Sequence, residues 1–466
     1  MTGRSQDSRG DGSTTRSRLG AAGVLQIYVV LLILIPPRYV VPPLGAVGTP
    51  ATIVGLGALL LWCLAVILPG GYLRRTVLPL RLVLVFLFGT VLASYAVLHS
   101  HWVPVAELLS SDRTLLQVLS WLGVALLAAE GLDGLDDVYR VLRTLVVAVA
   151  AMSIVGVLQF YAGINLADVA GVIPGLQQNA LLDSVQARAG FRRPAGTATH
   201  PIEFGCVIAM VLPLALHLAR FDTTRSWLRR WWPLGAIAMG VPVAVSRSAV
   251  LGAVVAGVII FVGFEPKARP RALAAVAMFA CVIYATTPGL LGTLRNMIVG
   301  AGSDPSITTR TSDYEVVAGY VQRAPIIGRG PGTFLADHRI LDNQYLLTVI
   351  EIGLVGLFAV VVYLVATSFF GRGARHRTSD PRLRDVGQAL AATGMVAVVT
   401  SFMFDGFSFL MYAGLIPLTL GLAAGLWALV RESAPINSAP PPGADEAPVG
   451  ATRVDATALV TPNSAR

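Results

Sequence analysis

The stretch "QYLLTVIEIGLVGLFAVVVYLVATS", residues 344–368, decides the fold class. A helix needs about 20 apolar residues to cross a bilayer, and this run contains a single charged side chain, Glu351. The rest of the chain has the same character. Hydrophobic residues make up 55% of it and charged residues 13%, against roughly 25% charged residues in soluble domains. We therefore expect an integral membrane protein, located in the cytoplasmic (inner) membrane.

Further apolar runs of similar length predict an all-α, polytopic fold with about twelve transmembrane helices. The period-two alternation of an outer-membrane barrel is absent from these runs. The membrane domain is expected at 19–430, between disordered cytoplasmic ends at 1–18 and 431–466. The predicted helices are 19–36, 48–68, 78–98, 114–131, 140–163, 202–220, 232–246, 248–265, 270–290, 344–368, 386–404 and 409–430.

The distribution of basic residues predicts the orientation of these helices. The net charge is +9, but the Arg residues lie mostly in alternate short loops, which is the pattern of cytoplasmic loops and not of a nucleic-acid-binding surface. With the N-terminus inside, two long segments fall outside, 164–201 and 291–343. The second is a large extracytoplasmic loop between helices nine and ten. Topology does not explain the arginines in these two segments, so they become candidates for function.

Two of the candidate sites are centred on arginine residues near the outer face. Arg192 and Arg193 lie in the passage just before the sixth predicted helix. Arg247 lies in "AVSRSAV", at the turn between the seventh and eighth, where a charge is costly unless it meets water, a carboxylate or a phosphate. An interfacial residue that only marks the turn is the alternative for Arg247.

A third arginine, Arg310, is expected just ahead of a short helix over 313–323. Ser312 and Glu315 have the spacing of a capping box for that helix. A guanidinium beside free backbone N–H groups would form an anion site. The alternative is an ordinary surface arginine near a helix cap.

A polar cluster precedes the run at 344–368. Asp342 and His338 are candidate general bases, and Asn343 and Tyr345 candidate substrate contacts. The N-cap of the following helix is the alternative for Asp342. The glycines of "GRGPGTF" predict a tight re-entry turn, because the Lys-Ser/Thr ending of a nucleotide loop is missing. No metal-binding spacing of His or acidic residues stands out, and we expect neither a metal nor a cofactor.

Several motifs together resemble the O-antigen ligase and polymerase superfamily over roughly residues 155–370. Their order and spacing carry the resemblance more than any single motif does. The motifs are "LQFYAGIN" (158–165), "RRPAGTATHPIEFG" (192–205), "VSRSA" (245–249), "PIIGRGPGTF" (325–334) and "DNQYLLTVIEIGLVGL" (342–357), together with the segment around Arg310.

The resemblance implies a metal-independent glycosyltransferase with a GT-C-like fold that acts at the outer face of the membrane. Its donor would be a glycan on a polyprenyl pyrophosphate, and its acceptor a glycan or lipid-glycan, with membrane lipid around both. Residues matching Arg247 and Arg310 would bind the pyrophosphate, helped by Arg192 or Arg193. Ligases have His where this chain has Asp342, so the base, and the choice between ligase and polymerase, stay open.

Two other functions compete with this one. A transporter or flippase of lipid-linked saccharide, or of another anionic solute, would also use many helices and outward arginines. Transporters, however, place charges near the bilayer midplane and often contain repeats or broken helices. The predicted helix centres here are nearly free of charge, which favours the enzyme. A membrane scaffold without chemistry is the third possibility.

Overall fold

The structure, a computed structural model, describes residues 20–68, 76–179, 185–188, 191–287 and 305–433, together with positions 73, 289 and 292. The predicted disordered segment 1–18 and nearly all of the predicted tail 431–466 lie outside these residues. The last helix reaches Ser433, so it extends slightly beyond the expected boundary at 430.

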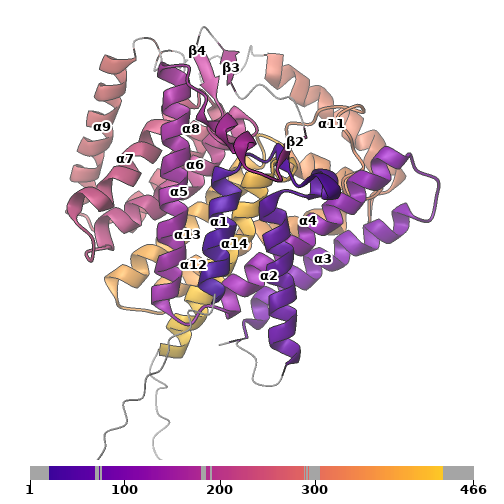
Figure 1. Cartoon of the computed structure of the whole chain (residues 1–466), viewed down its shortest axis with the longest axis horizontal. Helices are drawn as coiled ribbons and strands as arrows, with labels where there is room; N and C mark the ends of the chain where they lie inside the picture. Colours follow the sequence, from indigo (N-terminus) through magenta and orange to yellow (C-terminus); the bar gives the residue numbers. More distant parts are fainter. Residues whose placement is uncertain are drawn as a thin grey trace, which may run out of the picture.

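A helix lies at each of the twelve segments predicted to be helical (Figure 1). Eight helices in the described chain are long and apolar enough to cross a membrane, which confirms a helical, multi-pass membrane protein. The total of twelve spans stays a prediction. The helices at the predicted segments are α1 (Ala21–Leu34), α2 (Pro50–Ile67), α3 (Leu78–Leu98), α4 (Val105–Glu130), α5 (Leu135–Tyr161), α6 (Pro201–Phe221), α7 (Trp227–Val243), α8 (Arg247–Gly263), α9 (Arg269–Thr286), α12 (Gln344–His376), α13 (Pro381–Thr400) and α14 (Leu410–Ser433).

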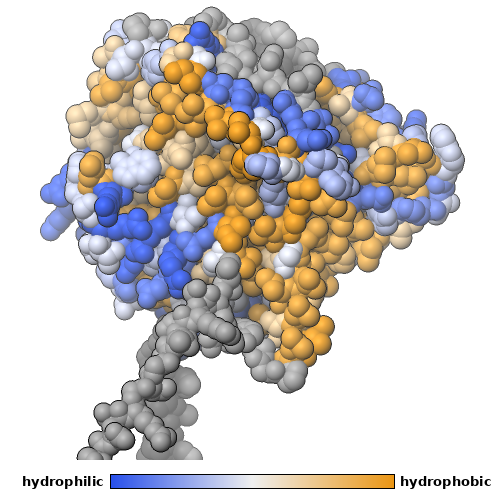
Figure 2. Space-filling model, viewed as in Figure 1, coloured by the Kyte–Doolittle hydropathy of each residue, from blue (hydrophilic) through white to orange (hydrophobic). Residues whose placement is uncertain are grey.

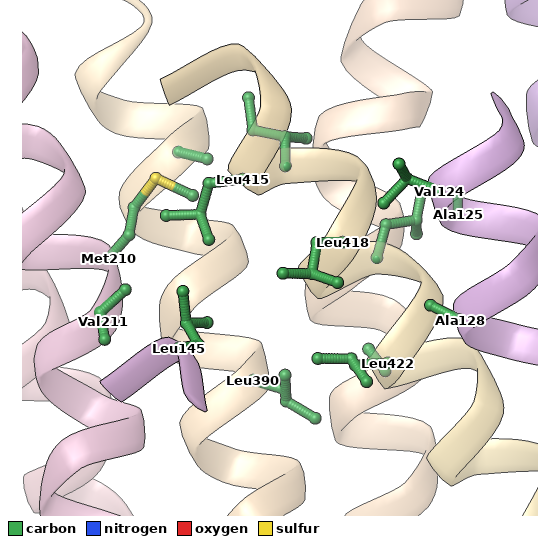
Figure 3. Close-up of a cluster of buried hydrophobic side chains, with 14 of the residues drawn as sticks. Val124, Ala125, Ala128, Leu145, Met210, Val211, Leu390, Leu415, Leu418 and Leu422 are labelled. Atoms are coloured by element: carbon green, nitrogen blue, oxygen red, sulfur yellow. The ribbon is translucent and has the colours of Figure 1, made fainter. Parts of the chain in front are cut away.

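The last of these helices, α14, is the central helix of the bundle. It packs against α4, α12 and α13. Figure 3 shows Leu415, Leu418 and Leu422 of α14 among apolar side chains from α4, α5, α6 and α13. Small residues let the helices approach closely, since a Cβ added at Gly421 would lie 2.4 Å from the Ala125 carbonyl oxygen of α4.

The outside of the bundle is hydrophobic. Figure 2 shows a broad hydrophobic surface over α2, with hydrophilic residues above it near α11 (Pro305–Arg323). Only 17% of the apolar window of α2 and 6% of that of α9 are buried within the chain. Soluble proteins rarely expose contiguous apolar patches larger than roughly a few hundred Å². These faces therefore fit contact with lipid.

The two ends of the bundle differ. Two short antiparallel strand pairs and α11 lie at the end that we call the upper end, and the α12–α13 connection and the end of α14 lie at the lower end (Figure 1). In the first pair, β1 (Tyr39–Val40) pairs with β2 (Gln177–Gln178). In the second, β3 (Val185–Arg188) pairs with β4 (Phe191–Pro194).

Ion pairs hold helices together at the lower end. Asp385 of α13 lies 2.8 Å from His217 Nδ1 and 2.6 Å from the Arg220 guanidinium, both on α6. Arg143 of α5 donates to Asp222, just after α6, at 2.7 Å. These arginines are paired within the fold, so they are not free to bind a substrate.

Glu203 has a comparable structural role near the upper end. It is fully buried in α6, and one of its carboxylate oxygens accepts from the backbone N–H groups of Met411 and Tyr412, at 2.9 and 3.2 Å. The other oxygen accepts from the Thr199 N–H at 2.8 Å. A carboxylate at a helix N-terminus stabilises that helix, and Glu203 thereby fixes the start of α14.

The helix predicted at 114–131 is longer than expected, because α4 begins at Val105. Its first turns are rich in polar residues, so a search for apolar runs could not detect them. Glu107 in the first turn suits the partial positive charge of a helix N-terminus.

The short helix predicted at 313–323 is also longer, since α11 begins at Pro305. The prediction that Ser312 and Glu315 form a capping box was therefore wrong. Arg310 lies within the helix and not ahead of it. Proline is favoured in the first turn of a helix, because its fixed φ suits the helix and its missing N–H leaves no donor unsatisfied there.

Candidate functional site

A cavity of 490 Å³ lies between α4 and the first half of α12. Each helix turns one face toward it, because lining residues recur at spacings of three and four along both. The segment that follows α11 and the connection between α13 and α14 supply further walls, and residues after α1, on α3 and just before α6 also line the cavity. The residues from the two helix faces include Ser110, Arg113, Thr114, Gln117 and Trp121 of α4, and Gln344, Leu347, Thr348 and Glu351 of α12.

A break in α12 positions this cavity. The helix, expected to be continuous, is interrupted at Gly353, which has a φ of 71°. The segment 325–330 satisfies the backbone groups that the break releases. Leu354 N–H donates to the Pro325 carbonyl at 2.9 Å, and Gly330 N–H donates to the Glu351 carbonyl at 2.9 Å. Backbone groups within a bilayer need such partners. The prediction that the glycines form a tight turn is confirmed, and its re-entry into the membrane stays a prediction.

Gly328→Ala should destabilise this turn. Gly328 has a φ of +79°, and an added Cβ would lie 2.3 Å from the Glu351 carbonyl oxygen. We expect a loss of at least about 1–3 kcal/mol, measured as a lower Tm of the purified protein. Gly319→Ala in α11 is the matched control, because a Cβ there meets nothing within 4 Å. An equal Tm for both variants would contradict the assignment of the turn.

Two carboxylates line the cavity. Glu351 accepts from the Phe334 N–H at 3.3 Å, so it joins α12 to the glycine segment. Asp405 lies in the connection between α13 and α14. Burial raises the pKa of the Asp405 carboxyl to about 6, and the negative charge of Asp342 adds to the rise. Asp342 therefore lies close enough to Asp405 for the two charges to interact.

His338 is bound to a buried carboxylate from a distant part of the chain. Its Nε2 lies 3.0 Å from Glu107 Oε1 at the start of α4, and Arg329 donates to the other oxygen at 2.7 Å. Glu107 is only 4% exposed. A carboxylate that holds one imidazole nitrogen fixes the orientation of the ring, which is a common arrangement for a histidine base.

The other residues of the predicted polar cluster are partly structural. Asn343, and not Asp342, is the N-cap of α12, since its side chain accepts from the Tyr345 and Leu346 N–H groups. The alternative N-cap role of Asp342 was therefore wrong. Tyr345 is 9% exposed, and its hydroxyl donates to the Val398 carbonyl of α13 at 2.8 Å. This contact directs Tyr345 toward α13.

The segments carrying Arg193 and Arg247 lie beside each other. Arg247 is the first residue of α8, and the turn before it contains Val245 at a φ of 45°. A positive φ is strained for a β-branched residue. Val245 belongs to a buried cluster with Phe160, against which Phe191 of β4 packs. This cluster brings β4, with Arg192 and the buried Arg193, next to the α7–α8 turn.

Residues 199 and 200 connect this basic region to the cavity. Thr199 lines the cavity, and the next residue, His200, lies near Arg193. Burial lowers the pKa of His200 to about 4, and the Arg193 guanidinium adds to the lowering. His200 is therefore neutral at neutral pH, and its Nδ1 accepts from the Ile202 N–H as the N-cap of α6.

Comparison with known families identifies one segment of the chain. Residues 232–361 match the family described as O-antigen ligase. These residues belong to the O-antigen ligase family. No curated protein shows significant similarity to the chain.

The O-antigen ligase segment confirms the resemblance read from the sequence. It runs from within α7 to the middle of α12 and contains Arg247, Arg310, His338 and Asp342. The match indicates, in general terms, a glycosyl-transferring function in polysaccharide assembly. The polar face of α4, the arginines of β4 and Asp405 lie outside the matched residues.

Several site residues were not identified from the sequence. Glu107 and Arg113 lie before the predicted helix start at 114, and Gln117 lies within the predicted helix without standing out from it. The spacing of Arg113 and Gln117 could have revealed that they share a helix face, because Arg113, Gln117 and Trp121 follow one another at intervals of four residues. Asp405 is a single carboxylate between two helices, and no local pattern distinguishes it.

Proposed function

We propose that the chain transfers or polymerises a polyprenyl-pyrophosphate-linked glycan at the outer face of the cytoplasmic membrane. One observation carries this proposal: the adjacent residues Thr199 and His200 join the cavity to the basic region of β4 and α8. A lipid-linked donor needs cations for its pyrophosphate next to a polar space for sugars. The O-antigen ligase segment supports this substrate class.

The upper end is proposed to be extracytoplasmic, and with it the segment 291–343. Basic residues are concentrated in the connections of the opposite end, such as the one between α12 and α13. Cytoplasmic loops carry this excess of arginine and lysine.

In the proposed reaction, an acceptor hydroxyl attacks the anomeric carbon of the donor sugar. The bond from that carbon to the phosphate oxygen breaks, and polyprenyl pyrophosphate leaves. Asp342 or His338 takes the hydroxyl proton, while Arg247 and Arg310 stabilise the negative charge of the leaving group. Arg310 is assigned through the family resemblance alone. Neither metal nor cofactor enters this scheme.

The alternative is a transporter of lipid-linked saccharide or another anionic solute, and the break of α12 at Gly353 favours it. Broken helices are common in transporters. Here, however, the released backbone groups bond to the segment 325–330, which leaves them unavailable for a solute.

The test uses the full chain in lipid nanodiscs with polyprenyl-pyrophosphate-linked glycan and an acceptor fraction from the host. Mass spectrometry measures free polyprenyl pyrophosphate, whose release we expect to depend on Arg247. Product size separates one-step ligation from polymerisation. No release, together with movement of the intact donor between leaflets of sealed liposomes, would instead establish the transporter.

Transfer should fall as the pH is lowered through about 6. Asp405 has a raised pKa of about 6, so it is ionised above this pH and protonated below it. Protonation of Asp405 removes one negative charge from beside Asp342. Asp342 then attracts the proton of the acceptor hydroxyl less strongly. A pH–rate profile should show the inflection in the wild type and not in Asp405→Asn. The same inflection in both proteins would exclude Asp405 as its origin.

A further inference from the structure

The cavity between α4 and α12 contains a cation that the proposed reaction does not use. Three arginines line it. Arg38 forms an ion pair with Asp168, and Arg339 forms one with Asp313 at 2.6 Å. Arg113 has no hydrogen-bond or ion-pair partner within the part of the chain that the structure describes. Its guanidinium, in the polar first turns of α4, is therefore available to bind an anion in the cavity.

The surroundings of Arg113 match the chemistry of a sugar. Gln117 and Thr114 lie on the same face of α4. The Gln117 amide donates to the Phe407 carbonyl at 3.3 Å and the Thr114 hydroxyl to the Ser110 carbonyl at 3.0 Å, so the oxygens of both side chains can still accept from sugar hydroxyls. Deeper along that face is Trp121, whose ring lies 5.1 Å from that of Phe407, measured between centroids. Aromatic rings offer apolar surface to the C–H faces of a sugar.

The charges of the cavity limit the ligand further. Glu351 and Asp405 also line it, so a group with several negative charges, such as a pyrophosphate, would meet carboxylates there. A single negative charge opposite Arg113 avoids that repulsion. The planar guanidinium suits a carboxylate best, because a carboxylate carries one charge and accepts two parallel hydrogen bonds, whereas a phosphate monoester carries nearly two charges at neutral pH.

We propose that this cavity binds a saccharide unit carrying one anionic group. Arg113 binds the anionic group, and the aromatic rings of Trp121 and Phe407 pack against the face of the sugar ring. This assignment rests on the proposed function, because it makes the cavity the place of the acceptor glycan. The volume of 490 Å³ lies within the usual range of small-molecule sites, roughly 300–1,000 Å³.

Binding of soluble saccharides tests the proposal without any transfer. The full chain in nanodiscs is titrated with cellobiose, with cellobiouronic acid and with glucose 1-phosphate, and saturation-transfer NMR gives each Kd. We expect an anionic probe to bind about 10-fold or more tightly than cellobiose, the usual effect of a charged hydrogen bond. Arg113→Ala should abolish that preference, and Arg113→Glu should reverse it.

The controls separate charge from folding. Arg113 is exposed, so its replacement should leave the Tm unchanged. Arg229→Ala removes an exposed arginine at the start of α7 and should keep the wild-type preference. A preference for cellobiouronic acid identifies a carboxylate as the anion, and one for glucose 1-phosphate identifies a phosphate. Equal binding of all three probes, or a preference that survives Arg113→Ala, would overturn the proposal.

The two proposals fail in different ways. If the wild type releases polyprenyl pyrophosphate but saccharide binding does not depend on Arg113, the transferase proposal is supported and the acceptor-site proposal is refuted. If saccharide binding depends on Arg113 but no donor and acceptor pair gives release, the transferase proposal is refuted and the saccharide-binding site is supported.

Discussion

Arg247→Ala should lower the rate of polyprenyl pyrophosphate release by about 100- to 1,000-fold, the usual effect of removing one group that stabilises developing negative charge. Arg247 is the first residue of α8, after a strained, buried Val245, and lies next to the strand that carries Arg193. A strained turn costs free energy and is frequent at functional sites. The measurement is single-turnover release in nanodiscs with saturating donor.

The variant should remain folded, since alanine is compatible with the first turn of a helix. A Tm close to that of the wild type checks this. Arg229→Ala is the matched control, because it also removes an arginine near the start of a helix but at the lower end. Arg247→Lys should recover only part of the rate, since an ammonium lacks the paired donors of a guanidinium. Wild-type release by Arg247→Ala would refute the assignment of this arginine to the pyrophosphate.

Asp342→Asn should slow the chemical step by about 100- to 10,000-fold while donor binding changes little. Asp342 precedes the N-cap of α12 and lies close enough to Asp405 for their charges to interact. The amide keeps the shape of the side chain and removes its basicity. Single-turnover rates and donor Kd values, measured separately, distinguish a base from a binding residue.

Asp337→Asn is the control, since this exposed carboxylate lies nearby in the same segment. His338→Gln tests the competing base, which Glu107 holds through Nε2. A large loss in His338→Gln with an unchanged rate in Asp342→Asn would transfer the role to the histidine. Loss of donor binding alone in Asp342→Asn would make Asp342 a structural residue.

The positions of the helices could be predicted from the sequence because a bilayer leaves the backbone few options. An apolar run such as 344–368 must satisfy its own hydrogen bonds, and a helix does so. The polar first turns of α4 have no such requirement, so their hydropathy resembled that of a loop. The break at Gly353 was also hidden, because glycine within an apolar run is compatible with a continuous helix.

The candidate site was predictable only where its residues are close in the chain. His338, Asp342 and Asn343 form a visible cluster, and Arg247 stands out between two apolar runs. Glu107 and His338 are 231 residues apart, and their contact depends on how α4 packs beside the segment after α11. Distant pairs of this kind leave no trace in local spacing.

The break in α12 also determines the depth of the cavity. The apolar part after Gly353, residues 354–370, is about 26 Å long at 1.5 Å per residue, and so covers most of the roughly 30 Å of a hydrocarbon core. The first half of α12, with the cavity that it lines, would then lie toward one surface of the membrane. A substrate with a lipid anchor would reach the cavity by diffusion within the leaflet. The search for the site would then take place in two dimensions, without withdrawal of the anchor from the membrane.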